Sequence, residues 1–146
     1  MDHQKLQNLL KILPNLPEAQ LRDLIVSLDE QEILAEREKA RESFMAFVKK
    51  VWPSFVEGSH HKRMAKAFER VARGECKRLI INMPPRHTKS EFASYLLPAW
   101  FLGNFPEKKV IQTSHTAELA VGFGRKVRNL VDQDVYTEIF PGMGLQ

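Results

Sequence analysis

The sequence of 146 residues contains little of what defines several classes of protein. It has one cysteine, Cys76, so no internal disulfide can form and no cysteine-based zinc site is indicated. Seven glycines and eight prolines do not make a collagen-like or low-complexity chain. No apolar run approaches the roughly 18 residues of a membrane span, and the start MDHQKLQNLL lacks the pattern of a secretory signal. We therefore expect a protein of the soluble, intracellular type.

The residues that are present are sufficient for a folded core and are unevenly charged. Hydrophobic residues make up 43% and charged residues 27% of the chain, which is enough apolar material for one domain. Residues 1–58 hold eight Lys/Arg and ten Asp/Glu, whereas residues 59–146 hold fourteen and eight. A basic second half is typical of a surface that handles the phosphates of a nucleotide or of DNA. A solvated basic face without such a role is the alternative.

Hydrophobic periodicity predicts helices in the first third of the chain. Apolar residues recur at helical spacing in residues 6–13, 17–28 and 30–51. We expect residues 1–43 to be a helical N-terminal arm that leads into a globular part at Phe44. Residues 44–146 form the second predicted region.

The second region alternates between helical and strand-like patterns. Residues 77–82 (KRLIIN) and 109–113 (KVIQT) have the β-branched apolar character of buried strands. Predicted helices begin near residues 59, 89 and 116. The order predicts an α/β fold, namely an incomplete parallel sheet of the P-loop NTPase type, flanked by helices and preceded by the all-helical segment. Two strands alone would leave apolar edges open to association.

Residues 83–90 (MPPRHTKS) resemble the phosphate-binding loop G-x-x-x-x-G-K-[ST]. Lys89 and Ser90 match, whereas Met83 and Thr88 replace the two glycines. Such a loop needs inward backbone N–H groups at a helix N-terminus, a lysine for the β- and γ-phosphates and a hydroxyl for Mg²⁺. If Thr88 has to adopt a positive φ, the strain is on the order of 1–3 kcal/mol. An ordinary turn with surface charges is the alternative.

The motifs on both sides of this loop resemble a known family. The pair HH at 60–61, the turn ARGE, INMPPRH-x-KSE and the following KKVIQTSHTAELAVGFGRKVRNLV are similar to the large terminase subunit of tailed bacteriophages. The similarity runs from about residue 44 to 141 and corresponds to the N-terminal part of that family's ATPase domain. The family's loop commonly reads PPRHGKS, so Thr88 is a departure from it.

The resemblance implies roles for individual residues. Lys89 would bind the β- and γ-phosphates of ATP and Ser90 would bind Mg²⁺, while Arg86 could sense the γ-phosphate. The full set of predicted nucleotide contacts is Pro85, Arg86, His87, Thr88, Lys89, Ser90 and His61. Ser59, His60 and His61 would lie on the adenine side of the nucleotide. His60 also falls on the apolar stripe, so packing in the core is the alternative for it, and His61 is the better ligand candidate. Arg125 or Arg128 could act as an arginine finger, and Ser114 and His115 would lie at the carboxyl edge of the sheet.

The implied function is ATP-driven movement of duplex DNA into a viral capsid. The implied partners are double-stranded DNA, the small terminase subunit, the capsid portal and further copies of the chain, in the host cytoplasm and without a membrane. The residues after Val131 offer no apolar strand that ends in adjacent acids, and no nuclease follows, so the chain is expected to be truncated and to have little turnover. The alternative is a non-catalytic DNA- or protein-binding module with a degenerate loop.

Overall fold

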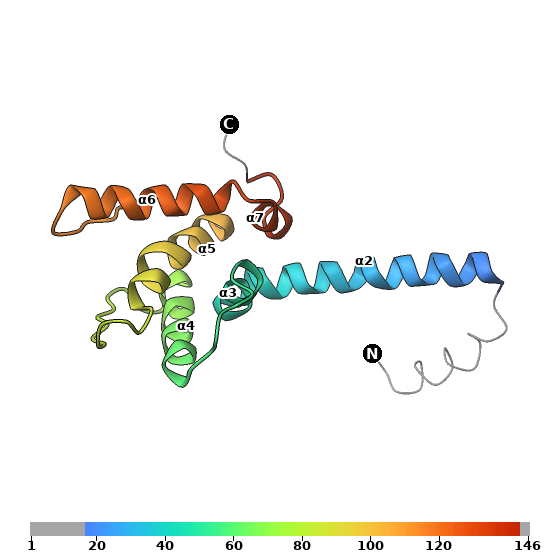
Figure 1. Ribbon diagram of the computed structural model, residues 1–146, viewed down its shortest axis with the longest axis horizontal. Coiled ribbons are helices and arrows are strands. Elements are labelled where there is room, and N and C mark those ends of the chain that lie inside the picture. Colours follow the sequence, from blue (N-terminus) through green and yellow to red (C-terminus); the bar gives the residue numbers. More distant parts are fainter. Residues whose placement is uncertain (1–16, 144–146) are drawn as a thin grey trace. The chain divides into compact units, whose positions relative to one another are not determined.

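The computed structural model describes residues 17–143, so the predicted helix at residues 6–13 lies outside the described residues. The chain divides into two compact units, residues 1–36 and 37–146. None of the described helices has both the length and the apolar character needed to cross a membrane. The regular elements of the described residues are α2 (Glu18–Glu42), α3 (Phe44–Val51), α4 (Ser59–Ala72), the π-helix η2 (Glu91–Leu96), α5 (Leu97–Asn104), α6 (Ala117–Val131) and α7 (Asp134–Ile139), as Figure 1 shows.

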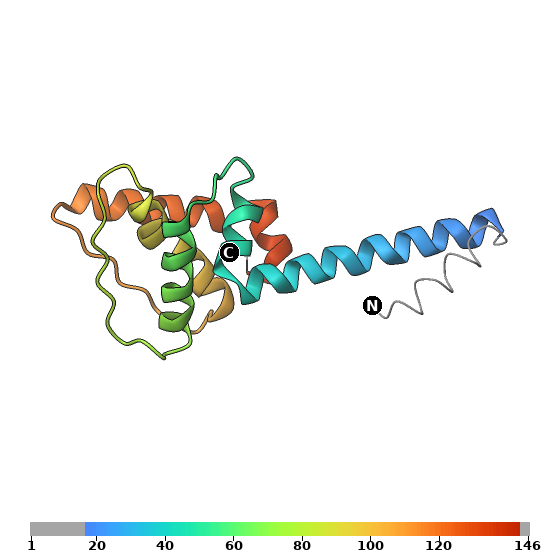
Figure 2. The ribbon, with the colours of Figure 1, turned by 90° about the horizontal axis from the view of Figure 1, so that it is seen from below.

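The predicted α/β fold is wrong, because residues 17–143 contain helices and coil but no strand. The two predicted strands are coil, and Figure 2 shows them as irregular chain outside the helices. We call residues 77–82 and 109–113 the first and second coil segments. Ile80 is 85% exposed and Ile111 is 89% exposed. Parallel strands are stable when several of them pair and both faces are covered, and two short segments meet neither condition.

Ser43 separates the two helices at the start of the globular unit. It occupies an extended conformation, and its hydroxyl accepts a hydrogen bond from the N–H of Ala46. The N–H of Phe44 donates to a carboxylate oxygen of Glu69 at 2.9 Å. The predictions of separate helices at 17–28 and 30–51 are therefore wrong in their boundaries, because α2 is continuous through residue 29 and ends before Ser43.

The core of the second unit is built around Phe44, which is fully buried. Its ring packs edge to face with Phe68 at 5.4 Å and with Phe92 and Trp100 at 5.6 Å each. These partners come from α4, η2 and α5. The indole N–H of Trp100 also donates to the carbonyl of Ala40 at 3.0 Å. This cluster holds in place the helical residues 89–104, through Phe92 and Trp100.

Helix α7 closes the other side of the core. Tyr136 is fully buried, and its hydroxyl donates to the carbonyl of Ala99 at 2.9 Å. Burial raises the pKa of Tyr136 to about 12. Phe140 packs so closely on α5 that a Cβ at Gly103 would lie 2.6 Å from its ring. Gly103 is therefore required by the close approach of this ring.

Residues 89–104 are continuously helical despite Pro98. Proline has no N–H for the carbonyl four residues earlier and its ring crowds that carbonyl. The helix widens before Pro98, since the N–H of Leu97 donates to the carbonyl of Phe92, five residues back. The carbonyl of Ser94 instead accepts a hydrogen bond at 2.6 Å from the side chain of Gln112. The second coil segment is thereby tied to the helix.

Candidate functional site

Residues 83–90 join the first coil segment to the helical residues 89–104. The N–H of Phe92 donates to the carbonyl of Thr88 at 2.9 Å, which closes the first helical turn. The N–H groups of residues 89–91 come before this bond and have no acceptor within the helix. A helix start with free N–H groups favours negative charge through both its donors and its dipole. We call residues 83–90 the candidate loop.

The candidate loop contains two strained residues. Arg86 has φ 65° and Thr88 has φ 55°, and no other non-glycine residue among residues 17–143 has a positive φ. A residue with a β-carbon meets steric conflict in this left-handed region, and a β-branched residue such as threonine meets more. Thr88 stands at the position where the phosphate-binding loop has its second glycine. The sequence raised the case in which Thr88 adopts a positive φ, and the structure shows this conformation.

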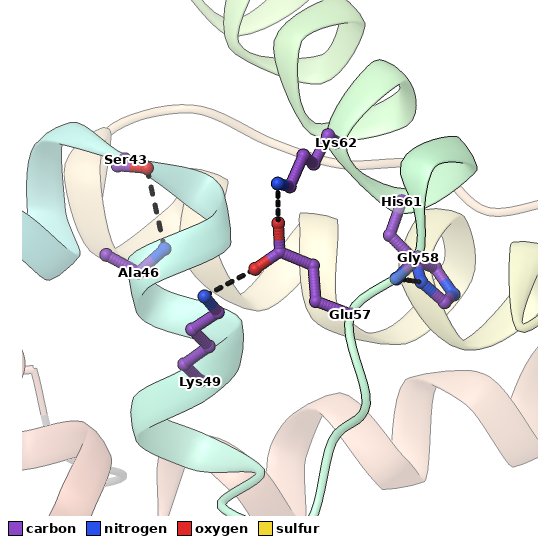
Figure 3. Close-up of polar contacts among 7 residues, drawn as sticks. All are labelled: Ser43, Ala46, Lys49, Glu57, Gly58, His61 and Lys62. Carbon is purple, nitrogen blue, oxygen red and sulfur yellow. Dashed lines mark hydrogen bonds and ion pairs between the residues drawn. The ribbon is translucent and has the colours of Figure 1, made fainter.

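The side chain of Thr88 is held by a histidine of another element. The Thr88 hydroxyl donates to the carbonyl of His87 at 2.7 Å, and its Oγ1 lies 2.6 Å from Nε2 of His61. Nδ1 of His61 accepts from the N–H of Gly58 at 2.9 Å, as Figure 3 shows. These partners assign the imidazole hydrogen to Nε2, which donates to Thr88. Both ring nitrogens of His61 therefore form hydrogen bonds within the chain.

The imidazole of His61 lies in an aromatic pocket. The residue is 6% exposed, and its ring centroid lies 4.7 Å from that of Phe55 and 5.0 Å from that of Phe92. Burial lowers the pKa of His61, because the charged imidazolium loses its hydration. The neighbouring His60, at a ring separation of 3.8 Å, lowers this pKa further.

The expected roles of the two adjacent histidines are reversed in the structure. The apolar stripe favoured packing of His60 and left His61 as the better ligand candidate, but His61 is buried and His60 is only half-buried. The spacing 61, 64, 65 and 68 also matches one face of a helix, and residues at these four positions are buried in α4. Contact of His61 with adenine stays a prediction. The geometry supports a structural contact with the loop.

Glu57 fixes the segment that precedes α4. Its carboxylate forms ion pairs with Lys49 of α3 and with Lys62 of α4, the latter at 3.2 Å, and Figure 3 shows both. The hydrogen bond from Lys49 is the main cause that lowers the pKa of Glu57. At Gly58, a Cβ would lie 2.8 Å from the His60 ring, so a side chain at this position would require that ring to move.

Lys89 spans the candidate loop. Its ammonium group donates to the carbonyl of Met83 at 2.7 Å, which joins the last residues of the loop to the first. Ser90 is exposed and forms no side-chain capping bond. His87 Nδ1 donates to the carbonyl of Pro85 at 2.9 Å. The structure thus gathers the predicted loop residues and His61 in one place.

The predicted residues outside the loop are not gathered in the same way. Arg125 and Arg128 are exposed on α6, and Arg128 contacts its neighbour Asn129. The cation of α6 that contacts the helix after the loop is Lys126, whose ammonium lies 2.8 Å from the Glu91 carboxylate. Lys126 was not predicted from the sequence. The signal that could have found it is its place directly before Val127, a buried residue of the apolar stripe of α6. The arginine finger stays a prediction.

Ser114 and His115 are exposed residues that follow the second coil segment. Their expected position at the carboxyl edge of a sheet is wrong, because the described residues contain no sheet. The rule that places ligands at this edge applies to open α/β sheets and gives no information here.

A groove adjoins the candidate loop. It has a volume of about 290 Å³ and lies between α4 and residues 79–83. Met64 and Ala67 line it on the α4 side, with His60 and Arg63 also contributing. Among residues 17–143, no group of three or more His, Cys, Asp or Glu side chains is arranged to hold a metal ion. The site therefore offers amide donors, one ammonium group and an apolar groove, but no preformed metal centre.

We found no family model, no curated protein and no solved structure that matches this chain. The resemblance to the terminase large subunit rests on the motif residues of the sequence and stays a prediction.

Proposed function

We propose that the candidate loop binds the phosphates of ATP, as the nucleotide-binding front end of a viral DNA-packaging motor of the large terminase type. The observation that carries the proposal is the left-handed conformation of Thr88 directly before Lys89. Strain in a loop is kept where the surrounding structure over-determines it, and such positions concentrate at ligand-binding sites.

The donors of the loop fit a polyphosphate. The N–H groups of residues 89–91 have no acceptor within the helix, and they lie at the start of a helical run that extends to residue 104. The ammonium of Lys89 already crosses the loop to the Met83 carbonyl, and a phosphate would be a stronger acceptor for it. Arg86 is exposed on the same loop and adds a second cation.

The residues present also fit Mg²⁺ that arrives with the nucleotide. Magnesium usually keeps several waters and takes phosphate oxygens with only one or two protein ligands. Ser90 supplies one exposed hydroxyl next to Lys89. Held by Ser90 and the phosphates, Mg²⁺ would supply positive charge that neutralises the phosphates. The chain's own residues bind and orient the phosphates.

The wider assignment follows from the motif resemblance and from charge. Residues 59–146 carry the positive excess, which suits a surface facing duplex DNA. Under this proposal the partners are duplex DNA, the small terminase subunit, the capsid portal and further copies of the chain, in the host cytoplasm. ATP turnover by these 146 residues is expected to be small, because no carboxylate that could activate water is assigned.

A non-catalytic module that binds DNA or a protein is the second candidate. It is favoured by the absence of any strand before the loop in residues 17–143. In such a module the strained loop would bind no nucleotide.

Titration of a fluorescent ATP analogue with Mg²⁺ separates the two candidates. We expect saturable binding that Lys89→Ala weakens about tenfold or more, since a hydrogen bond to a charged group contributes about 1.5–3 kcal/mol. Lys66→Ala is the matched control, because Lys66 is an exposed lysine of α4, and it should bind within about twofold of wild type. Equal binding by wild type and Lys89→Ala would contradict the proposal. DNA binding with a steep salt dependence and no effect of ATP would favour the module.

A further inference from the structure

We propose that His61 is a positioning residue of the candidate loop, and that its hydrogen bond holds Thr88 in the left-handed conformation that frees the loop amides. The inference rests on the proposed function for the identity of the ligand. The contact itself can be tested without any ligand.

The need for such a residue follows from the identity of residue 88. Glycine reaches a positive φ without a steric penalty, whereas threonine has a branched Cβ that opposes it. Thr88 has φ 55°, so forces outside the residue must keep it there. Its hydroxyl has two partners, the adjacent carbonyl of His87 and Nε2 of His61. Only His61 belongs to a separate element, so it is the contact that can anchor the loop to the core.

The imidazole is itself fixed and can serve as an anchor. Nδ1 accepts from the N–H of Gly58, and the ring packs between Phe55 and Phe92 (Figure 3 shows the Gly58 contact). Phe92 belongs to the helix that follows the loop, and its ring also belongs to the aromatic cluster around Phe44. The position of Thr88 is thus connected to the core through one buried ring.

The arrangement requires the neutral form of His61. A proton on Nδ1 would face the N–H of Gly58, so the imidazolium would lose this bond and the ring would be displaced. The titratable groups that act on the ring are His60 of α4, His87 of the loop and Glu57 of the preceding segment, while η2 presents the apolar ring of Phe92. Burial lowers the pKa of His61, so the neutral form holds at pH 7 and is lost only in acid.

A double-mutant cycle in urea unfolding of the full chain tests the contact. His61→Phe keeps an aromatic ring among Phe55 and Phe92, and Thr88→Val keeps the branched shape without the hydroxyl. We expect the two changes to couple by about threefold to tenfold in the unfolding equilibrium constant, the range for one net hydrogen bond. Thr137→Val removes a hydroxyl bonded to the Asp134 carbonyl on α7 and should not couple with His61→Phe. Additive effects of His61→Phe and Thr88→Val would overturn the inference.

Binding of the fluorescent ATP analogue with Mg²⁺ tests the consequence for the loop. In the wild-type background we expect His61→Phe to weaken binding about tenfold. In the Thr88→Gly background the same change should cost less than about threefold, because glycine holds a positive φ unaided. Thr88→Ser keeps the hydroxyl and should bind at least about fivefold more tightly than Thr88→Val. Equal losses in the two backgrounds would contradict the positioning role.

The pH dependence of binding supplies a readout that a merely structural role would not change. As the pH is lowered below 6.5 into the range where His61 takes up a proton, affinity should fall more in the wild-type protein than in Thr88→Gly, since only wild type depends on neutral His61. The phosphates of the ligand also titrate near pH 6, but they do so equally with both proteins. Identical pH profiles would count against the inference.

The two proposals fail in different ways. If wild type binds no nucleotide but His61→Phe and Thr88→Val couple in unfolding, the proposed function fails and the role of His61 in holding Thr88 is supported. If wild type binds nucleotide and the unfolding cycle is additive, the inference fails and the proposed function stands.

Discussion

The aromatic cluster around Phe44 and the two coil segments are both rich in apolar residues, yet the cluster is buried, whereas the residues of the coil segments are exposed or only partly buried. Phe44 is fully buried, whereas Ile80 and Ile111 are almost fully exposed. A helix satisfies its own backbone and needs only a neighbouring face to bury its side chains. A strand needs both a paired neighbour and a covering layer. Apolar character therefore indicates burial only where the geometry supplies partners.

The largest change in the free energy of unfolding is expected when one ring is removed from the cluster. Phe44→Ala should lower the free energy of unfolding by about 3–5 kcal/mol, because it leaves a cavity among the three rings that pack on it edge to face. Ile111→Ala should change the free energy of unfolding by less than about 0.5 kcal/mol, because its side chain is already in water. Urea unfolding monitored by circular dichroism measures both. A comparable loss for Ile111→Ala would show that the second coil segment is buried in solution.

An intermediate loss of unfolding free energy is expected when the buried hydroxyl of Tyr136 is removed. Tyr136→Phe keeps the ring and removes the bond to the Ala99 carbonyl, so we expect a loss of about 1–2 kcal/mol at pH 7. Burial raises the pKa of Tyr136 from 10.0 to about 12, so the unfolded chain ionises first as pH rises. The contribution of Tyr136 is thus fully present below pH 10 and is lost as pH approaches 12.

Urea unfolding of both proteins over this pH range checks the sign. The difference in stability between wild type and Tyr136→Phe should shrink as pH rises, and Tyr95 contributes equally to both. A difference that stays constant would show that the hydroxyl is hydrated.

The smallest effect concerns the bond that ties the second coil segment to the helix. Gln112→Ala should cost about 1 kcal/mol, since it leaves the Ser94 carbonyl without its side-chain donor. In the Pro98→Ala background residue 98 supplies an N–H for this carbonyl, so Gln112→Ala should cost less than half as much. Gln31→Ala, at an exposed position of α2, is the matched control in urea unfolding. If Gln112→Ala lowers the free energy of unfolding equally in the wild-type and Pro98→Ala backgrounds, the bond from Gln112 does not compensate for the missing N–H of Pro98.

Patterns among neighbouring residues predicted several helix ends, buried helix faces and the candidate loop. Helix α4 ends near Gly74, which has φ 77° as a helix-ending glycine commonly does. Met64 and Phe68 of α4 and Val127 and Leu130 of α6 recur at helical spacing and are buried, whereas Leu119, on the same stripe of α6, is 43% exposed. The loop 83–90 and the helix after it were also found from the sequence, because proline, a strained turn and a helix start act within a few residues.

Contacts between distant residues explain the errors. The pairing of His61 with Thr88 joins residues 27 positions apart, and no periodicity reports it. The capping role of Ser43 was missed, although a serine before an amphipathic run is a known helix start. The strand predictions failed because β-branched runs indicate a preference that only paired neighbours can realise.

The sequence by itself predicted the helices that begin near residues 59, 89 and 116 and a loop that carries an ammonium group and a hydroxyl at a helix start, because these features depend on neighbouring residues. The tertiary structure alone decided that Thr88 takes a positive φ and that the two apolar segments remain unpaired. The physical reason is that a strained or extended backbone persists only when side chains or strands from elsewhere in the chain satisfy it. For Thr88 that partner is His61, and for the coil segments no strand among the described residues takes that role.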